Sequence, residues 1–425
     1  MRVVILGAGV LGLATAYYLL RDGHQVIIVD RNDGVALETS YANGAQLSYS
    51  YVAPLAGPGV LPKIPPWLLR RDSPLRFYPA LNPHQWSWLV SFVLACNRRQ
   101  SDLTTRRLLA LSFYSRSLMQ ELLAEEAIEF GHATNGKLVV YSDRVGFDAA
   151  RRLVDYQRSL GCVQEALGRD ECLALEPALA AGGSALGARV AGGVYTPSEA
   201  VGDCYRFCVG LEKRTIAAGA DLRLSTDATR LAVTSRRVTH LETPAGPLEG
   251  DAFVVALGSR TPFLVRPLGI HVPVYPLKGY SLTLPVTGPA PKVSVTDFKR
   301  KIVYAPLSTP EGAAVRVAGM ADIAGYSRRP DPRRVAQLLA DTRAALPKAA
   351  DYSRPIETFQ PWIGLRPATP KGAPILGATP VSNLFLNCGQ GALGWTLALA
   401  SGRVVADTIV GRKAQVPIEG FRISD

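Results

Sequence analysis

The chain has few of the features that mark membrane-spanning, secreted or metal-binding proteins. Its 425 residues contain no run of 18 uninterrupted apolar residues, so we predict no membrane-spanning helix. The opening MRVVILGAG is too short and too glycine-rich an apolar run for a secretory signal peptide. The six cysteines form no CxxC pair, and no clustered His, Asp or Glu accompanies Cys204 and Cys208. We therefore expect no metal site, buried free thiols and a cytoplasmic location.

A block of like charge is also missing. The formal net charge is +12 and the pI is about 9.5, a balance that favours anionic partners. Lysine and arginine are scattered along the chain, so no nucleic acid partner is expected. Apolar residues make up 48% of the chain, which is enough for a large core. The length suggests two or three domains, or one large split domain.

A nucleotide-binding pattern begins at residue 3. VVIL (3–6) reads as a short strand, and Gly7-Ala8-Gly9-Val10-Leu11-Gly12 follows it directly. An apolar helix and a second strand, VIIV (26–29), come next, and the strand ends at Asp30. Gly7 permits a tight turn, Gly9 lets the backbone approach a pyrophosphate, and Gly12 lets the helix pack on the sheet. The full sequence of strand, glycine turn, helix, strand and acid predicts a dinucleotide-binding unit, for NAD or for FAD.

Two further segments extend this unit. ETSYANGAQ (38–46) is small and polar, and its side chains can donate to phosphate or flavin groups; an ordinary structural loop is the alternative. FVVALGS (253–259) is an apolar strand that meets a glycine turn, which is typical of the dinucleotide sheet resuming after an excursion. The predicted fold class is α/β, α+β overall, with a discontinuous Rossmann-like domain and an antiparallel-sheet substrate domain.

The predicted division of the chain follows from this. The dinucleotide domain is assigned residues 1–55, 165–262 and 345–425, and the substrate domain residues 56–164 and 263–344. A strand is expected at 137–141, and helices are expected at 101–130, 144–160, 203–218, 331–346 and 393–410.

Segment 60–96 combines prolines, arginines and aromatic residues. Its apolar part holds Trp86, Trp88 and Phe92 and is too short to cross a bilayer. It could pack as a buried helix or a subunit contact. It could instead lie in a membrane interface, with Arg70, Arg71 and Arg76 meeting anionic headgroups on the cytoplasmic face of the inner membrane. The sequence leaves both alternatives open.

A family resemblance emerges from the motifs taken together. They are GAGVLG, Asp30, ETSYANGAQ, ALGS, VYPLKGYSL, WIGLRPATPKGAPILG and NCGQGALGWT, and they run from residue 1 to about 410. This combination resembles the D-amino-acid-oxidase-like flavoproteins, and within them most of all the small subunit of bacterial D-amino-acid dehydrogenases. Glycine oxidase is a more distant likeness. The chain departs from the dehydrogenases at Gln390, where they usually have His, and at Gly44-Ala45, where they tend to have Ala-Gly.

The resemblance implies a noncovalent FAD between the two domains. The residues expected at its ADP half are Gly7, Gly9, Val10, Leu11, Gly12, Asp30, Arg31, Ala228, Ala256 and Gly258. Those expected along the pyrophosphate and flavin are Thr39, Ser40, Asn43, Gly44 and Gln46. Gly391, Gly394, Trp395 and Thr396 would open the last helix, whose positive end would face the flavin and stabilise the negative charge of its reduced form.

One arginine stands out on the substrate side. Arg366 lies in PWIGLRPATPKGAPILG (361–377), a stretch without Asp or Glu, although arginine is rarely buried without a partner. A planar guanidinium pairs with both oxygens of a carboxylate, and the resemblance aligns Arg366 with the arginine that binds the substrate carboxylate. Tyr280 and Tyr304 are candidates to bond the carboxylate or line the pocket, with packed strand aromatics as the alternative. Tyr49, Tyr51 and Lys278 are weaker candidates.

The implied reaction is oxidative deamination of a D-amino acid. Hydride would move from the α carbon to flavin N5, and the imino acid would hydrolyse to a 2-oxo acid and ammonia, or remain a cyclic imine for proline-like substrates. In some of the oxidases that the chain resembles, a lysine on a strand of the substrate domain promotes reaction with O2. The strand that corresponds to it here, AVRVAGM (314–320), carries Arg316 and no lysine, so the resemblance favours a quinone or another acceptor over O2. An O2-using amine oxidase of the glycine or sarcosine type is the alternative, and a flavin-binding protein without turnover is a third hypothesis.

Overall fold

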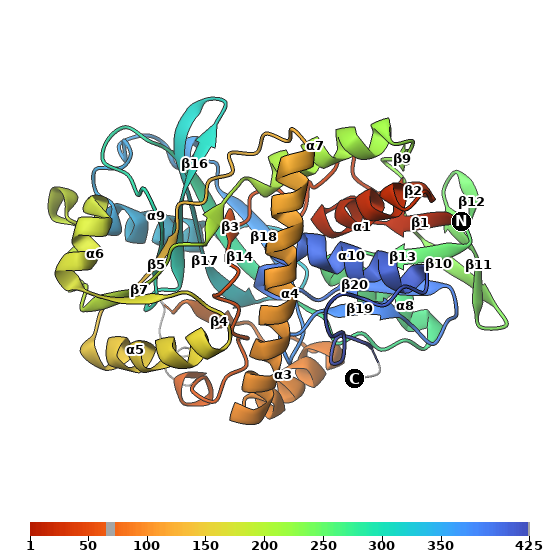
Figure 1. Cartoon of the computed structure of the whole chain (residues 1–425), viewed down its shortest axis with the longest axis horizontal. Helices are drawn as coiled ribbons and strands as arrows, with labels where there is room; N and C mark the ends of the chain where they lie inside the picture. Colours follow the sequence, from red (N-terminus) through yellow and green to blue (C-terminus); the bar gives the residue numbers. More distant parts are fainter. Residues whose placement is uncertain (65–72, 424–425) are drawn as a thin grey trace.

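The computed structural model describes residues 1–64 and 73–423, and two sheets organise them (Figure 1). The six-stranded sheet has the order β19 (Ile375–Ala378), β20 (Leu384–Cys388), β13 (Ala252–Val255), β1 (Arg2–Leu6), β2 (Gln25–Val29) and β9 (Asp221–Arg223). All neighbours pair in parallel except β19 and β20. This is the Rossmann-like sheet that the N-terminal pattern predicted.

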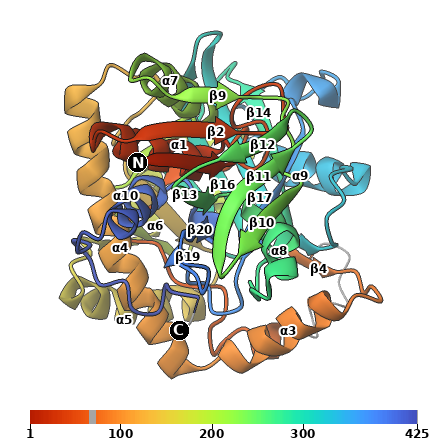
Figure 2. The same ribbon diagram turned by 90° about the vertical axis from the view of Figure 1, so that its right-hand side faces the viewer.

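Both faces of this sheet are covered, which explains why its strands are apolar throughout. Val3 and Ile5 belong to a buried cluster with α1 (Val10–Arg21), α4 (Arg98–Glu125), α7 (Cys204–Ala217) and α10 (Ala398–Ile409). Val4 and Leu6 face the other way, into a second cluster. The elements of that cluster are α8 (Thr261–Val265) and the three-stranded sheet of β10 (Arg230–Thr234), β11 (Arg237–Thr243) and β12 (Gly246–Glu249), which Figure 2 shows in front.

The second sheet has nine strands. Its order is β18 (Trp362–Ala368), β14 (Tyr275–Pro285), β17 (Gly312–Ile323), β16 (Ile302–Thr309), β15 (Ser294–Asp297), β5 (Lys137–Tyr141), β7 (Gly192–Thr196) and β6 (Glu165–Gly168), with β4 (Leu75–Phe77) beside β17. Most neighbours are antiparallel, as expected; β15 with β5 and β4 with β17 are parallel.

The remaining elements complete the two halves. The helices α5 (Arg144–Ser159), α6 (Arg169–Leu175) and α9 (Pro332–Ala345) lie around the nine-stranded sheet, on the left in Figure 1, and α3 (Pro83–Ala95) lies at the bottom of both views. The short strands β3 (Gln46–Leu47) and β8 (Ala200–Val201) pair antiparallel as a separate two-stranded sheet. The predicted strand and the helices expected at 144–160, 203–218 and 331–346 agree with these bounds to within about one residue. The helix expected at 101–130 spans Arg98–Glu125 instead, because the chain turns extended at Glu126. α10 starts later than expected, because a 3₁₀ turn occupies Gly391–Leu393.

The division of the strands differs from the predicted one at three places. β6, β7 and β18 were assigned to the dinucleotide domain, yet they belong to the nine-stranded sheet. β18 pairs along its whole length with β14, and β7 pairs with both β5 and β6. In addition, α4 was assigned to the substrate domain, yet it packs against α10. Composition along the chain does not reveal which distant strand a segment will pair with.

Candidate active-site cavity

A cavity of about 720 Å³ lies between the two sheets. The loops after β1, β2 and β13 line one side, and residues of β14, β16, β17 and β18 line the other. Every residue predicted to touch FAD lines this cavity, except Gly12. We call it the central cavity; its size and shape suit a large organic ligand.

The glycine turn after β1 shows distinct roles for its glycines. At Gly9, an added Cβ atom would have only the Ser40 Oγ within 4 Å, at 3.5 Å, so the missing side chain leaves open cavity space for a ligand. At Gly12, an added Cβ would lie 1.8 Å from the Gly7 carbonyl oxygen, so this glycine is needed for helix packing. Gly7 itself has a φ of +109°. The turn therefore brings open backbone to the N-terminus of α1, as a phosphate requires.

The loop after β2 is tied to this turn. The Asp30 carboxylate accepts hydrogen bonds from the Ala8 N–H (2.8 Å) and from the Asn32 N–H (2.9 Å). Arg31 pairs with Glu38. Asp30 thus holds the turn in place while its carboxylate faces the cavity.

Residues 39–48 cross the nine-stranded sheet strand by strand. At its first half, Thr39 Oγ1 donates to the Leu365 carbonyl on β18 (3.0 Å), and the Ala42 carbonyl accepts from Ser281 Oγ on β14 (2.6 Å). The Asn43 carbonyl then accepts from Arg316 Nη1 on β17 (3.1 Å). At its second half, Gln46 Nε2 donates to Ser294 Oγ on β15, and Gln46 Oε1 accepts from Lys137 Nζ on β5 (3.0 Å). The segment is therefore built as a continuous wall of the cavity and not as a free loop.

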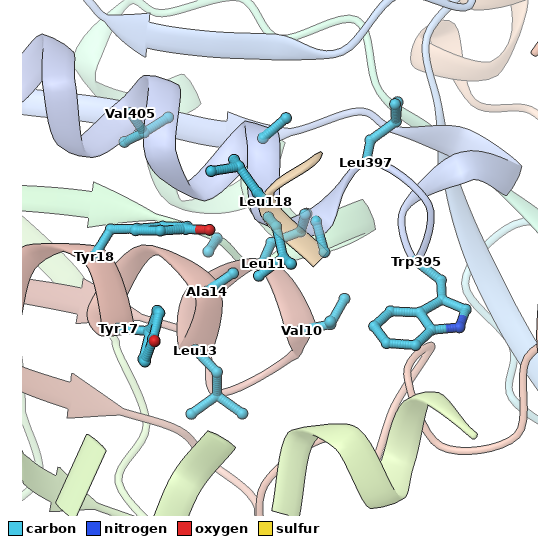
Figure 3. Packing of buried hydrophobic residues seen from close by; sticks show 14 of the residues in the cluster. Val10, Leu11, Leu13, Ala14, Tyr17, Tyr18, Leu118, Trp395, Leu397 and Val405 are labelled. Atoms are coloured by element: carbon cyan, nitrogen blue, oxygen red, sulfur yellow. The ribbon is translucent and has the colours of Figure 1, made fainter. Parts of the chain in front are cut away.

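The turn before α10 closes the cavity on the other side. Trp395 belongs to the same buried cluster as Val10 at the start of α1 (Figure 3), and its Nε1 donates to the Gly202 carbonyl (3.1 Å). Thr396 Oγ1 accepts from the Ser48 N–H (3.0 Å). Gln390 Oε1 is buried and has no partner within residues 1–64 and 73–423, so a buried acceptor beside this turn is available to a ligand.

Arg366 reaches the cavity from β18. Its Nη1 donates to the Met320 carbonyl (2.8 Å), and no carboxylate of the described chain lies within ion-pair distance of it. Met320 has a φ of +61° at a bulge in the β14–β17 pairing, which turns this carbonyl toward the guanidinium. Burial lowers the Arg366 pKa, and Asp322 partly offsets this effect. The rest of the guanidinium fork is left for an anion.

The two candidate tyrosines differ. Tyr280 contributes to the cavity lining, although its ring packs in the same buried cluster as Tyr304. Its hydroxyl donates to Asp322 Oδ2 (2.8 Å), and Asp322 Oδ1 pairs with the fully buried Arg334 (2.7 Å). Tyr304 does not line the cavity; it lies fully buried in the core behind the sheet. Its predicted site role is therefore wrong. The reason is alternation along β16, where Val303 faces the cavity and its neighbour Tyr304 faces away.

Two buried charges were missed by the sequence analysis. They are Lys137, which lies at the start of β5 and lines the cavity, and Glu199, which lies behind it. Tyr51, one of the weaker candidates, also lines the cavity, whereas Tyr49 does not. β5 is buried at all five positions, so a lysine beginning this apolar strand was a signal of an interior cation. Lys278 does not line the cavity; its Nζ donates to the Arg329 carbonyl (3.2 Å).

Segment 60–96 is partly described. Arg70 and Arg71 lie outside the described residues. Arg76 pairs with Asp331 (3.7 Å). On α3, Trp88 and Phe92 are buried, while the opposite face exposes Trp86, Val90, Val93 and Leu94, the last at 73% of its surface.

Within the described chain, no helix combines the length and apolarity needed to cross a membrane, and no three or more metal-ligating side chains cluster.

Comparisons with known proteins agree with this architecture. The family described as FAD dependent oxidoreductase (DAO) matches residues 2–408. D-amino acid dehydrogenase 2 of Ralstonia nicotianae is 51% identical over 432 residues, covering all of both chains. The crystal structure of glycine oxidase from Geobacillus kaustophilus has a TM-score of 0.77 at 22% identity, over 99% of this chain and 98% of that one. L-proline dehydrogenase from P. horikoshii has a TM-score of 0.76 at 15% identity, over 99% and 96%. The two structures show a shared fold.

Proposed function

The chain belongs to the family of FAD-dependent oxidoreductases, and we propose that it is a D-amino acid dehydrogenase with FAD bound noncovalently in the central cavity. The observation that carries the substrate class is Arg366, a guanidinium in this cavity that bonds a backbone carbonyl and pairs with no carboxylate of the described residues. An amino acid carboxylate is the anion that fits its planar fork. The full-length similarity to D-amino acid dehydrogenase 2 supports the D configuration.

The residues of the cavity fit FAD. Gly9 leaves open space beside the N-terminus of α1 for a pyrophosphate, and Asp30 presents a carboxylate for ribose hydroxyls. Thr39, Ser40, Asn43, Gly44 and Gln46 line the path between this turn and the turn of Gly391, Gly394, Trp395 and Thr396. When bound, FAD supplies an acceptor for the hydride of the substrate.

The protein's own part in the reaction is to bind and orient. Arg366 pairs with the substrate carboxylate, and Gly279 opposite it leaves room for the guanidinium, because an added Cβ there would lie 2.4 Å from Arg366 Cζ. The fixed carboxylate holds the α carbon and its hydrogen in one orientation, and the apolar side chains of Leu277 and Pro367 keep that end of the cavity dry. The imino acid product then hydrolyses in water to a 2-oxo acid and ammonia, or stays cyclic when the substrate is proline-like.

Arg366→Lys tests this assignment. The lysine keeps the charge but loses the bidentate fork, so the D-amino acid concentration that gives half reduction of the flavin should rise roughly a hundredfold while FAD content stays unchanged. Anaerobic titration followed by flavin absorbance measures both. Lys278→Met serves as the matched control, because it removes a buried cation of β14 that does not line the cavity. Loss of FAD with unchanged substrate affinity would make Arg366 a cofactor residue.

We further propose that the electrons pass to a quinone or another acceptor than O2. The strand that would carry an O2-promoting lysine is β17, and its cation here is Arg316. Arg316 is bonded to Asp203 (3.1 Å), Asn43 and Thr283 and does not line the cavity, so it is not placed to promote reaction with O2. Quinone reduction in an oxygen-free assay, with little peroxide under air, is the expected result. Steady peroxide release at the rate of substrate oxidation would instead select the oxidase alternative of the glycine or sarcosine type.

The exposed apolar face of α3 is proposed to rest on a membrane surface. Trp86 and Leu94 lie on it, and a tryptophan beside aliphatic residues suits the interface of a bilayer. Liposomes containing anionic lipid should recruit the wild-type protein, and Trp86→Ser with Leu94→Ser should reduce recruitment. Val145→Ser with Leu153→Ser, which changes exposed apolar residues of α5, should not. Equal recruitment of both double variants would refute the assignment.

A further inference from the structure

A lysine with no assigned role is buried at the central cavity. Lys137 is 3% exposed and begins β5, which is separated from the Arg366 strand by β14, β17, β16 and β15. Its Nζ donates to Gln46 Oε1 (3.0 Å) and to Ser48 Oγ (2.9 Å), and it lies 4.3 Å from the centre of the Tyr51 ring. All four residues line the cavity.

These contacts tie Lys137 to the turn before α10. The Ser48 N–H donates to Thr396 Oγ1 (3.0 Å), and the same hydroxyl donates to the Gln46 carbonyl (3.5 Å). Lys137, residues 46–48 and Thr396 therefore form one hydrogen-bonded network. Gln46 and Thr396 are two of the residues that we assign to the flavin, so the ammonium stands next to that part of the site.

The charge of Lys137 is not cancelled by a direct ion pair. Glu199 is the nearby carboxylate, but it accepts from the backbone N–H groups of Tyr49 and Ser50 (2.7 Å for Ser50), and within the described chain no carboxylate comes within 4.0 Å of the lysine. Burial lowers the pKa of Lys137 to about 8, although Glu199 raises it, so the amine is mostly protonated at neutral pH. A buried cation held by neutral oxygens costs stability, which indicates a use for its charge.

We propose that Lys137 is a positioning residue that holds residues 46–48 against Thr396 and provides the positive charge that stabilises the reduced, anionic form of the bound flavin. The inference rests on the proposed function, because it requires FAD in the central cavity. In a dry cavity a fixed cation acts over several ångströms with little screening, so it favours the state of the cofactor that carries more negative charge. The N-terminus of the last helix would act in the same direction.

The test is the two-electron reduction potential of the FAD-bound protein, measured at neutral pH against a reference dye. Lys137→Met, which has nearly the same length without the charge, should shift the ratio of reduced to oxidised flavin at a given dye potential about tenfold toward the oxidised form, which corresponds to about 30 mV for a two-electron couple. Lys137→Gln should behave similarly, although its amide can still bond Ser48. Lys137→Arg should restore most of the wild-type potential, because it keeps the charge.

Lys278→Met is the control that shows whether a change in potential comes from the charge at Lys137 or from the loss of any buried positive charge. Lys278 is also buried but lies off the cavity, so its removal should change the potential by much less. A wild-type potential in both neutral Lys137 variants, or an equal shift in the Lys278 variant, would overturn the proposal. So would loss of FAD from both neutral variants with retention in Lys137→Arg, which would make Lys137 a residue of cofactor retention. Absence of FAD from the unsubstituted protein would refute the proposed function instead.

Discussion

The two sheets present groups to the central cavity in different ways. The six-stranded sheet uses the loops at the carboxyl ends of β1, β2 and β13, where backbone N–H groups and the Asp30 carboxylate face the cavity. The nine-stranded sheet uses side chains on one face of its strands, among them Arg366 and Lys137. Strand ends can offer several backbone donors to a phosphate. A sheet face can instead place single side chains at fixed spacings around a small substrate.

This difference suggests that the two sheets affect different properties of the enzyme. Changes in the first sheet should alter retention of the cofactor, and changes in the second should alter substrate binding and flavin reactivity with the cofactor still bound. Substitutions that affect the other property would contradict this assignment. The following four are ordered by the size of the expected effect.

Gly9→Ala should have the largest effect. The added Cβ meets no protein atom closer than 3.5 Å, so the fold should be kept, but it enters the space assigned to the pyrophosphate. We expect the protein to elute from gel filtration without FAD, with a far-UV circular dichroism spectrum like that of the wild-type apoprotein. Gly59→Ala, at a site with no atom within 4 Å, is the control and should keep FAD. Full FAD content in Gly9→Ala would show that the phosphates lie elsewhere.

Gly279→Ala should act on the substrate alone. Its Cβ would lie 2.4 Å from the Arg366 guanidinium, which must move away because the backbone of β14 is fixed by pairing on both sides. A displacement on the order of 1 Å should raise the substrate concentration for half reduction by roughly tenfold to a hundredfold. FAD content, read from the ratio of absorbance at 450 and 280 nm, should stay the same. An unchanged titration would mean that Arg366 does not hold the substrate in its present place.

The smallest effects come from the two tyrosines. Tyr304→Phe removes a buried hydroxyl that has no partner in the described part of the chain, so stability against urea should rise by about 1 kcal/mol and turnover should not change.

Tyr280→Phe removes a bond to Asp322, so stability should fall by about 1 kcal/mol and substrate affinity should weaken a few-fold. If Tyr304→Phe impaired turnover more than Tyr280→Phe, the placement of β16 would be wrong.

The sequence predicted the first sheet better than the second for a physical reason. In the loop after β1, the glycines and the helix that follow are contiguous, so local pattern carries the geometry. On the nine-stranded sheet, position depends on pairing between distant strands and on which face each residue takes. Tyr304 was predicted to face the cavity, but its neighbour Val303 takes that side of the strand. Arg366 could be predicted because proline, glycine and apolar residues surround it in the sequence without an acid.

Lys137 shows what pattern reading misses. Its strand follows a long helix and precedes another, and nothing near it in the chain suggests a site. Only the pairing of β5 with β15 and the crossing of residues 39–48 over both strands bring it to Gln46. The assignments of β6, β7 and β18 failed for the same reason, since hydrogen bonds between strands far apart in sequence decide sheet membership.

The central claim is that this cavity oxidises D-amino acids at a bound flavin. The most direct measurement is anaerobic mixing of the FAD-bound protein with a panel of D-amino acids and with the corresponding L-enantiomers, followed by flavin absorbance near 450 nm. We expect one or more D-amino acids to bleach the flavin fully and their L-enantiomers to leave it oxidised. Bleaching by L-enantiomers alone, or no bleaching by any member of the panel, would contradict it.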